Sequence, residues 1–184
     1  MRSVVDEPVP GVLSREQLRL LIEGRERPLI SGCIDLETQL QPNGIDLTLR
    51  EISSFSGAGT IGEQAADRVL PDLEVVHFGQ DGWIDLQPGS YHILYNEVVD
   101  IPSSLMALGR PRSSLGRSGV TIHTAVWDAG YRGRSTSLLV VLNPHGFRLQ
   151  RNARVMQLVF LGLASATVSG YAGRYLNENT VEGR

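Results

Sequence analysis

Asp128 is the one carboxylate in the 77 residues between Asp100 and Glu178. The same interval contains nine arginines: Arg110, Arg112, Arg117, Arg132, Arg134, Arg148, Arg151, Arg154 and Arg174. A guanidinium group can bind phosphate through two parallel hydrogen bonds, whereas the ammonium group of lysine acts as a point charge. This stretch therefore suits an anionic ligand, with a single acid left for a separate task such as orienting a water molecule as a general base, or simply for capping a turn.

The charge is divided unevenly along the chain. Residues 1–100 carry 17 acids and 7 arginines, and residues 101–184 carry 3 acids and 10 arginines, so the two parts have net charges of −10 and +7. The chain has no lysine, so part of the arginine content reflects composition rather than function. A pI near 5.8 disfavours a general nucleic-acid binder. The basic half is either an anion-binding region or a solvated basic face.

Two short segments combine turn residues with groups that bind ions. In Gln41–Leu47, a Pro-Asn-Gly turn precedes an apolar strand and presents Asp46, which either holds a hydrated divalent cation or lies in a solvated turn. In Arg110–Arg117, Ser113 and Ser114 lie between arginines. If Ser113 begins a helix, the N–H groups of its first turn would point at a phosphate; the alternative is an ordinary helix cap beside solvated arginines.

Two later segments contain candidate ligand contacts. In Ala125–Gly133, two glycines bracket Tyr131, which is typical of a tight hairpin that a ligand approaches closely. Trp127 is interpreted as a core residue, whereas Tyr131 either belongs to the core or lies against a sugar ring. In Asn152–Phe160, Gln157 lies mid-strand among apolar residues, where it either satisfies a buried backbone group or contacts a ligand.

The elements that must position these residues are mostly strands. A capping box at Ser14 and Gln17 predicts a helix over residues 13–24. Alternation with a period of two predicts strands at Tyr91–Tyr95, Gly119–His123, Ser137–Leu142 and Val155–Phe160. Many short strands at near-regular spacing favour a β-sandwich or a barrel. The Ser-, Gly- and Ala-rich segment Ser53–Ala66 is predicted to be an inserted loop.

Length and composition place limits on the class of protein. A chain of 184 residues, 41% hydrophobic and 6% aromatic, is predicted to form a single domain over residues 1–184. No apolar run approaches the roughly 20 residues of a membrane helix, and the first residues lack a signal-peptide core, so a cytoplasmic protein is expected. Cys33 is the only cysteine, which excludes a disulfide framework and a cysteine-based zinc site.

Three sequences in combination resemble the dUTPase/dCTP deaminase superfamily of trimeric nucleotide-handling enzymes: RSSL at 112–115, WDAGYRG at 127–133 and ARVMQLVF at 153–160. The resemblance covers residues 12–175 and is greatest to the archaeal-type branch, in which dUTP hydrolases and dCTP deaminases share one scaffold. It implies a mainly β fold, a distorted, jelly-roll-like β-barrel with a short N-terminal helix. It further implies a homotrimer with active sites between subunits, dUTP as the substrate and Mg²⁺ as the cofactor.

The resemblance also implies roles for individual residues. Asp128 would be the catalytic acid that orients the attacking water, and Asp46 would act through water on the magnesium-bound triphosphate. Tyr131 would pack on the deoxyribose and disfavour a 2′-hydroxyl. The backbone around Ile122–Val126 would read the pyrimidine. The other implied substrate contacts are Arg112, Ser113, Ser114, Arg117, Thr124, Gln157, Arg174 and Tyr175.

One position in this superfamily distinguishes deamination from hydrolysis. In the deaminases, a glutamate ten residues after the equivalent of Asp128 shuttles protons at C4 of the pyrimidine, and Leu138 stands at that position here. Zinc-dependent deamination is also excluded, because the His-x-Glu and Pro-Cys-x-x-Cys sequences that it needs are absent. Hydrolysis of dUTP to dUMP and pyrophosphate, by attack of water at the α-phosphorus, is therefore favoured. A dCTP deaminase, with or without dUTPase activity, and a non-catalytic dNTP-binding regulator are the alternatives.

The C-terminal tail, residues 170–184, is predicted to close over the active site, although it departs from the pattern of the superfamily. Trimeric dUTPases carry a glycine-rich arm with a phenylalanine that stacks on uracil. This chain carries Arg174-Tyr175-Leu176 instead, which is more similar to the tail of the deaminases. In that tail a glutamine would be expected in place of Leu176.

Overall fold

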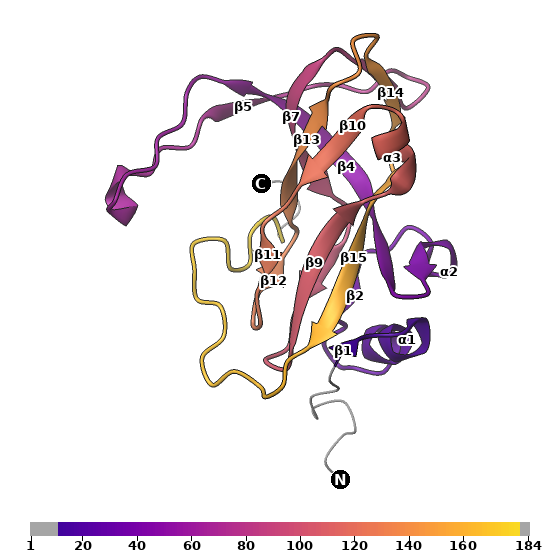
Figure 1. The fold of residues 1–184 in the computed structure, drawn as a ribbon, viewed down its shortest axis with the longest axis vertical. Coiled ribbons are helices and arrows are strands. Elements are labelled where there is room, and N and C mark those ends of the chain that lie inside the picture. The colour runs from indigo at the N-terminus through magenta and orange to yellow at the C-terminus, as the bar shows by residue number, and fades with distance from the viewer. Residues whose placement is uncertain (1–10, 181–184) are drawn as a thin grey trace.

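A computed structural model describes residues 11–180, and most of the chain in it is β-structure. The main path of the largest sheet contains β4 (Gly44–Ser56), β7 (Gly89–Tyr95), β9 (Leu105–Pro111), β10 (Val120–His123), β11 (Val126–Trp127), β13 (Thr136–Val141) and β15 (Arg154–Gly162). Their order is β10-β13-β7-β4-β15-β9-β11, and every neighbouring pair on this path is antiparallel. The sheet curls around the core (Figure 1), which confirms the predicted mainly β, barrel-like fold.

Shorter strands extend this sheet and form two small ones. The strands that pair at the margins of the main sheet are β1 (Gly11–Val12), β3 (Leu40–Gln41) and β5 (Asp72–Val75). A three-stranded sheet contains β2 (Ile30–Ser31), β8 (Val98–Asp100) and β12 (Arg132–Gly133). A two-stranded sheet contains β6 (Trp83–Leu86) and β14 (Phe147–Gln150). No helix within residues 11–180 is long and apolar enough to cross a membrane.

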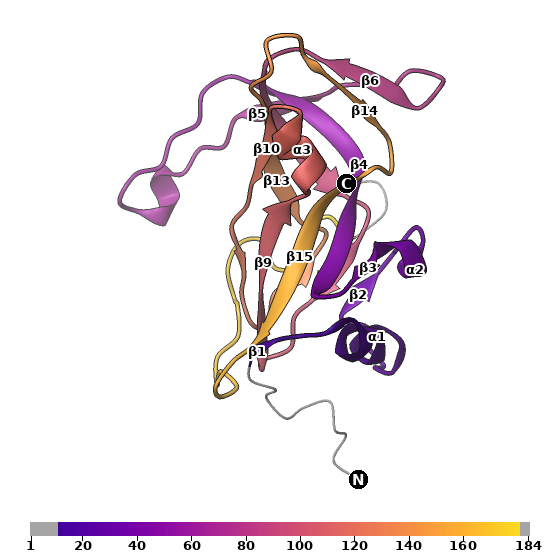
Figure 2. The ribbon, with the colours of Figure 1, turned by 45° about the vertical axis from the view of Figure 1, so that its right-hand side comes forward.

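Within the described residues, three short α-helices and one 3₁₀ turn complete the fold. They are α1 (Arg15–Glu23), α2 (Leu36–Gln39), α3 (Ser113–Arg117) and the 3₁₀ helix η1 (Ala65–Asp67). Helix α1 lies within the predicted range, and its capping box is confirmed: Ser14 Oγ accepts from the backbone of Gln17, and Gln17 Oε1 accepts from the backbone of Ser14. Figure 2 shows α1 and α2 near one another beside β2 and β3.

The predicted strands are confirmed, because their alternating side chains fill the core. In β15, Val155, Met156, Leu158 and Phe160 are buried, and Phe160 is fully buried. In β13, Leu139 and Val141 alternate with half-buried residues. A side chain on every second residue of a strand points to the same face of the sheet, so this period-two pattern places one face on the core.

The predicted loop at Ser53–Ala66 is partly wrong. Strand β4 continues to Ser56, where it pairs with β5, and Phe55 lies opposite Leu73. Both side chains are exposed, so this pairing comes from backbone hydrogen bonds and not from burial, and the hydrophobic pattern gave no sign of it. Figure 1 shows that the segment between β4 and β5, which includes η1, projects away from the sheet.

Gly44 is the residue at which the Pro-Asn turn enters β4. A Cβ atom at this position would lie 2.5 Å from the carbonyl oxygen of Leu158 and 3.1 Å from Cγ of Gln157. We expect Gly44→Ala to force β4 away from β15 and to lower the free energy of unfolding by about 1–3 kcal/mol, measured by urea denaturation. Gly116→Ala in α3 is the matched control, because no atom lies within 4 Å of its Cβ position. Equal stability of the two variants would show that the start of β4 tolerates a side chain.

Candidate active site

Asp46 is the buried centre of a cluster at one end of β4. Its side chain is 3% exposed, and Oδ2 lies 3.3 Å from Nη1 of Arg112 and 3.4 Å from Nη1 of Arg154. Burial raises the pKa of Asp46 above its ordinary value, and the charges of Arg112 and Arg154 oppose that shift. The side chains of both arginines are about one-third exposed. One buried acid therefore fixes two arginines whose outer faces remain available to an anion.

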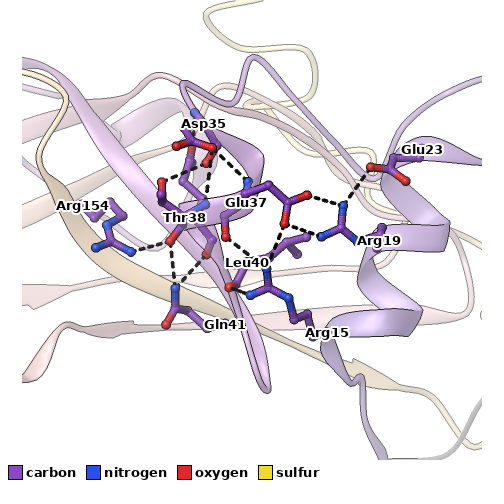
Figure 3. Close-up of polar contacts among 10 residues, drawn as sticks. Arg15, Arg19, Glu23, Asp35, Glu37, Thr38, Leu40, Gln41 and Arg154 are labelled. Carbon is purple, nitrogen blue, oxygen red and sulfur yellow. Dashed lines mark hydrogen bonds and ion pairs between the residues drawn. The ribbon is translucent and has the colours of Figure 1, made fainter.

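Backbone structure positions both arginines. Arg112 follows β9 as the N-cap of α3, and its N–H donates to the carbonyl of Val155 at 3.1 Å. Arg154 begins β15 and donates to the carbonyl of Thr38, at the edge of the polar network that links α1 and α2 in Figure 3. In that network Glu37 of α2 pairs with two arginines of α1, and these ion pairs hold the two helices together.

Ser113 begins a helix, which is the condition under which the sequence allowed a phosphate site at this point. Ser113 and Ser114 form the first turn of α3, both residues are exposed, and no side chain caps the helix. Gln157 lies on β15 opposite Asp46, is half-buried, and has its amide nitrogen 3.0 Å from the Cβ position of Gly44. The structure therefore brings Asp46, Arg112 and Gln157 to one end of the sheet, with both serines next in sequence to Arg112.

A buried network that the sequence did not reveal supports the strand segment of Asp46. The amide of Gln39 donates to the carbonyl of Asp46 at 2.8 Å and to Glu97 at 2.7 Å. Glu97 has no exposed surface, and it also accepts from the backbone N–H and the hydroxyl of Thr48 at 2.9 and 2.6 Å. Burial raises the pKa of Glu97, while these hydrogen bonds oppose the shift. Nothing in the local sequence separates Glu97 from an ordinary surface acid.

Asp128 belongs to a second group of residues. It is exposed in the turn after β11, and it lines a cavity of about 300 Å³ together with Tyr171, Tyr175 and Glu178 of the C-terminal segment. Trp127 is buried beneath the cavity and donates its indole N–H to Ser135 at 2.6 Å, which confirms that it is a core residue. A volume of this size is at the lower end of the range for small-molecule sites.

Tyr131 forms part of the wall of this cavity and is only 7% exposed. Its hydroxyl lies 3.0 Å from Ser135 Oγ and 2.8 Å from Glu178 Oε1, and its ring meets the ring of Tyr171 edge to face at 5.7 Å. Burial raises the pKa of the Tyr131 phenol, so the group stays protonated and donates. Glu178 and Tyr171 were both missed from the sequence, since only contact with Tyr131 makes either notable.

The tight hairpin predicted at Ala125–Gly133 is wrong. Strand β11 pairs with β9 and β12 pairs with β8, so the strands on either side of the turn enter different sheets. The glycines are needed in this segment for another reason. A Cβ atom on Gly130, whose φ is +85°, would lie 2.8 Å from Cα of Gly170. The close approach that these glycines permit is made by the C-terminal segment of the chain itself.

The two groups lie far apart within one chain. Trp127 is opposite Ala107 on β9, so Asp128 is level with Met106, six residues before Arg112. Six residues of extended strand span about 20 Å. The described residues therefore form two partial sites and do not join Asp128 to Arg112.

The remaining predicted contacts are dispersed. Arg117 is exposed in the last turn of α3, and Thr124 is half-buried just after β10. Tyr175 is half-buried and lines the cavity beside Asp128, whereas Arg174 is exposed. The end of the predicted tail, residues 181–184, lies outside the described residues. Within residues 11–180, no group of three or more His, Cys, Asp or Glu residues is arranged to hold a metal ion.

A sequence profile described as dCTP deaminase-like matches residues 12–163. The chain belongs to the dCTP deaminase-like family. The probable deoxyuridine 5′-triphosphate nucleotidohydrolase of Methanosarcina mazei is 52% identical over 170 residues, 92% of this chain and 99% of that protein. The Archaeoglobus fulgidus protein of the same name is 48% identical over 169 residues, 92% of this chain and 98% of that protein.

The fold of this family member is also that of a solved deaminase. The dCTP deaminase of Agrobacterium tumefaciens matches 82% of this chain with a TM-score of 0.60 and 23% identity, and this chain spans 48% of that one. An identity this low supports the fold alone. The family profile ends at residue 163 and so does not cover Tyr171, Tyr175 or Glu178.

Glu97 gives a prediction about pH. Because its pKa is raised in the folded chain, its contribution to stability is complete below the pKa of an unfolded glutamate and is lost as the pH rises through the folded value. Glu97→Gln removes this titration. We expect the melting temperature of the parent protein minus that of the variant to fall as the pH is raised from about 4 to 8 in a calorimetric series.

Glu74→Gln, on the exposed strand β5, is the matched control for that series. A difference between the parent protein and Glu97→Gln that stays level across the pH range would show that burial does not disfavour the ionised form of Glu97.

Proposed function

We propose that this chain hydrolyses dUTP to dUMP and pyrophosphate. The observation that carries the proposal is that relatives of nearly equal length, 46–52% identical, bear the name of that activity. The site chemistry supports it in two ways: an exposed acid beside a cavity suits the orientation of a water molecule, and the arginine cluster around Asp46 suits a polyphosphate. We expect the protein to act in the cytoplasm.

In the proposed reaction, Asp128 holds a water molecule in line with the α-phosphorus, and the bond to the bridging oxygen breaks to release pyrophosphate. Arg112, Ser113, Ser114 and Gln157 bind and orient the phosphates, because their polar groups lie at one end of the sheet. The described structure places Asp128 in solvent, so its carboxylate is accessible to a bound water.

The active site proposed here lies between subunits of a homotrimer. A carboxylate that orients a water attacking the α-phosphorus must lie within one water of the phosphate chain. Within one chain, Asp128 and Arg112 are separated by six residues of β9, about 20 Å. The phosphate-binding group of one subunit must therefore meet the Asp128 cavity of another.

Mg²⁺ fits this arrangement only through water and substrate. Asp46 is the one acid of the cluster, and its Oδ2 atom already contacts Arg112 and Arg154. Mg²⁺ usually keeps several waters and is held by one or two carboxylates together with substrate phosphates. Asp46 would hold such a hydrated ion on the triphosphate, and the ion would neutralise phosphate charge.

A deaminase acting on dCTP is the second candidate. Although Leu138 replaces the expected glutamate, Glu178 reaches the same cavity as Asp128 and burial raises its pKa. A carboxyl group with a raised pKa suits proton transfer near neutral pH. A non-catalytic regulator is less well supported, because nucleotide binding alone does not need an exposed acid at residue 128.

The proposed chemistry predicts the products. With Mg²⁺, we expect the purified protein to release pyrophosphate from dUTP and no ammonia from dCTP. Coupled assays measure both products. Ammonia from dCTP would replace the hydrolase proposal with deamination and would direct attention to Glu178.

Asp128→Asn tests the role of the acid. We expect the variant to lose at least about 10²-fold in turnover with an unchanged melting temperature, because general-base assistance of this kind is worth about 10²–10⁴ in rate. Asp85→Asn, an exposed acid on β6, is the matched control and should keep full activity. Hydrolysis near the parent rate in Asp128→Asn would remove Asp128 from the reaction.

A further inference from the structure

The C-terminal segment of residues 170–180 lies along β12 of its own chain. The N–H of Tyr171 donates to the carbonyl of Ala129 at 2.7 Å, and the N–H of Asn177 donates to that of Arg132 at 2.7 Å. Gly133 and Glu178 form a parallel bridge. In Figure 1 this segment, in yellow, runs beside β11 and β12. The segment consists of turns with a single bridge, and these backbone contacts dock it on the turn that carries Asp128.

Side chains reinforce this pairing. Arg132 Nη1 donates to Asn177 Oδ1 at 3.3 Å, and the amide of Asn179 donates to the carbonyl of Arg134 at 3.1 Å. Gly133 permits close packing here, because a Cβ atom there would lie 2.6 Å from the hydroxyl of Tyr131 and 3.1 Å from Cγ of Glu178. The turn that carries Asp128 is thus shaped to receive residues 170–180.

Glu178 ends a chain of hydrogen bonds that begins in the core. Trp127 donates to Ser135 at 2.6 Å, Ser135 lies 3.0 Å from the Tyr131 hydroxyl, and Tyr131 donates to Glu178 at 2.8 Å. Because Tyr131 gives its proton to Glu178, the proton of Ser135 must go to Tyr131. The order of donors is then fixed, and the carboxylate is its final acceptor. Loss of that acceptor would therefore disrupt this whole series of hydrogen bonds.

The walls of the cavity indicate which part of a nucleotide it takes. Trp127, Tyr171 and Tyr175 supply aromatic surface, and the two acids that line it are Asp128 and Glu178. The nearby arginines are engaged elsewhere: Arg132 of β12 with Asp100, and Arg134, which follows β12, with the carbonyls of Asn96 and Asn179. The described residues that line the cavity include no arginine for the outer phosphates, whereas a neutral base and sugar would meet aromatic rings and hydrogen-bond acceptors.

We propose that Glu178 is a positioning residue: as the final acceptor for Tyr131, it holds residues 170–180 against the turn that carries Asp128 in the same chain and so sets the shape of the cavity. The proposal rests on the function proposed above for its substrate, dUTP.

The first test changes the acceptor. We expect Glu178→Ala to raise KM for dUTP roughly tenfold with a smaller change in kcat, because one hydrogen bond to a charged group is lost. Glu178→Gln keeps an acceptor oxygen for Tyr131 and should restore most of KM. Glu74→Ala on β5 is the matched control. An unchanged KM in Glu178→Ala, or a Gln variant as impaired as the Ala variant, would overturn the role of Glu178.

The second test does not depend on activity. Arg132→Cys with Asn177→Cys places two cysteines at positions whose backbones are joined by a hydrogen bond of 2.7 Å, which keeps their Cα atoms close. Cys33 should not compete, because burial raises its pKa to about 12 and keeps it as the thiol. After mild oxidation, we expect a disulfide within single chains on a non-reducing gel. Disulfide-linked multimers, or no disulfide at all, would show that the segment does not dock on its own chain.

The third test separates this inference from the proposed function. Chains with Asp128→Asn are co-assembled with chains carrying Arg112→Ala, and separately with chains truncated after Gly170. If sites are shared between subunits, the first mixture regains hydrolysis. If the tail serves its own Asp128, the second does not, because no site holds both an intact Asp128 and an intact tail. Recovery in the second mixture would overturn the inference, while failure of the first alone would overturn the shared site.

Discussion

The hydrogen-bonded ladder of β15 is the constraint on which the arginine cluster around Asp46 depends. Gln157 of β15 lies opposite Asp46 on β4 and opposite Arg110 on β9, so an amide, an acid and an arginine form one row across three strands. A slip of one residue in either pairing would turn each side chain to the other face of the sheet. The register also carries Arg112 and Arg154 to Asp46.

The other edge of β9 keeps Asp128 far from this cluster. Pairing of β11 with β9 sets Asp128 level with Met106, at the opposite end of β9 from Arg112. A rigid sheet cannot shorten this distance, so no movement of loops within one chain would assemble both groups around one phosphate. The reaction that we propose therefore requires association of subunits.

The sequence predicted those features that depend on local periodicity or on short segments. The strands and the capping box at Ser14 were predicted, because each is set by neighbours in sequence, and a helix beginning at Ser113 was considered as one alternative. The support of Asp46 by Gln39 and Glu97 was not, since these residues meet only after β4 folds beside them. The prediction of a hairpin after Trp127 was wrong. A glycine indicates that something approaches the backbone closely, but the sequence does not show what approaches, which here is the C-terminal segment.

The distribution of charge acquires a physical meaning from this arrangement. At the end of the sheet that we propose binds phosphate, one buried acid holds two arginines, whereas the described residues that line the cavity include two acids and no arginine. In the proposed reaction, a nucleotide placed the wrong way round would leave these arginines without a phosphate ligand. The charges of the two half-sites would therefore favour one orientation of the substrate before any base is recognised.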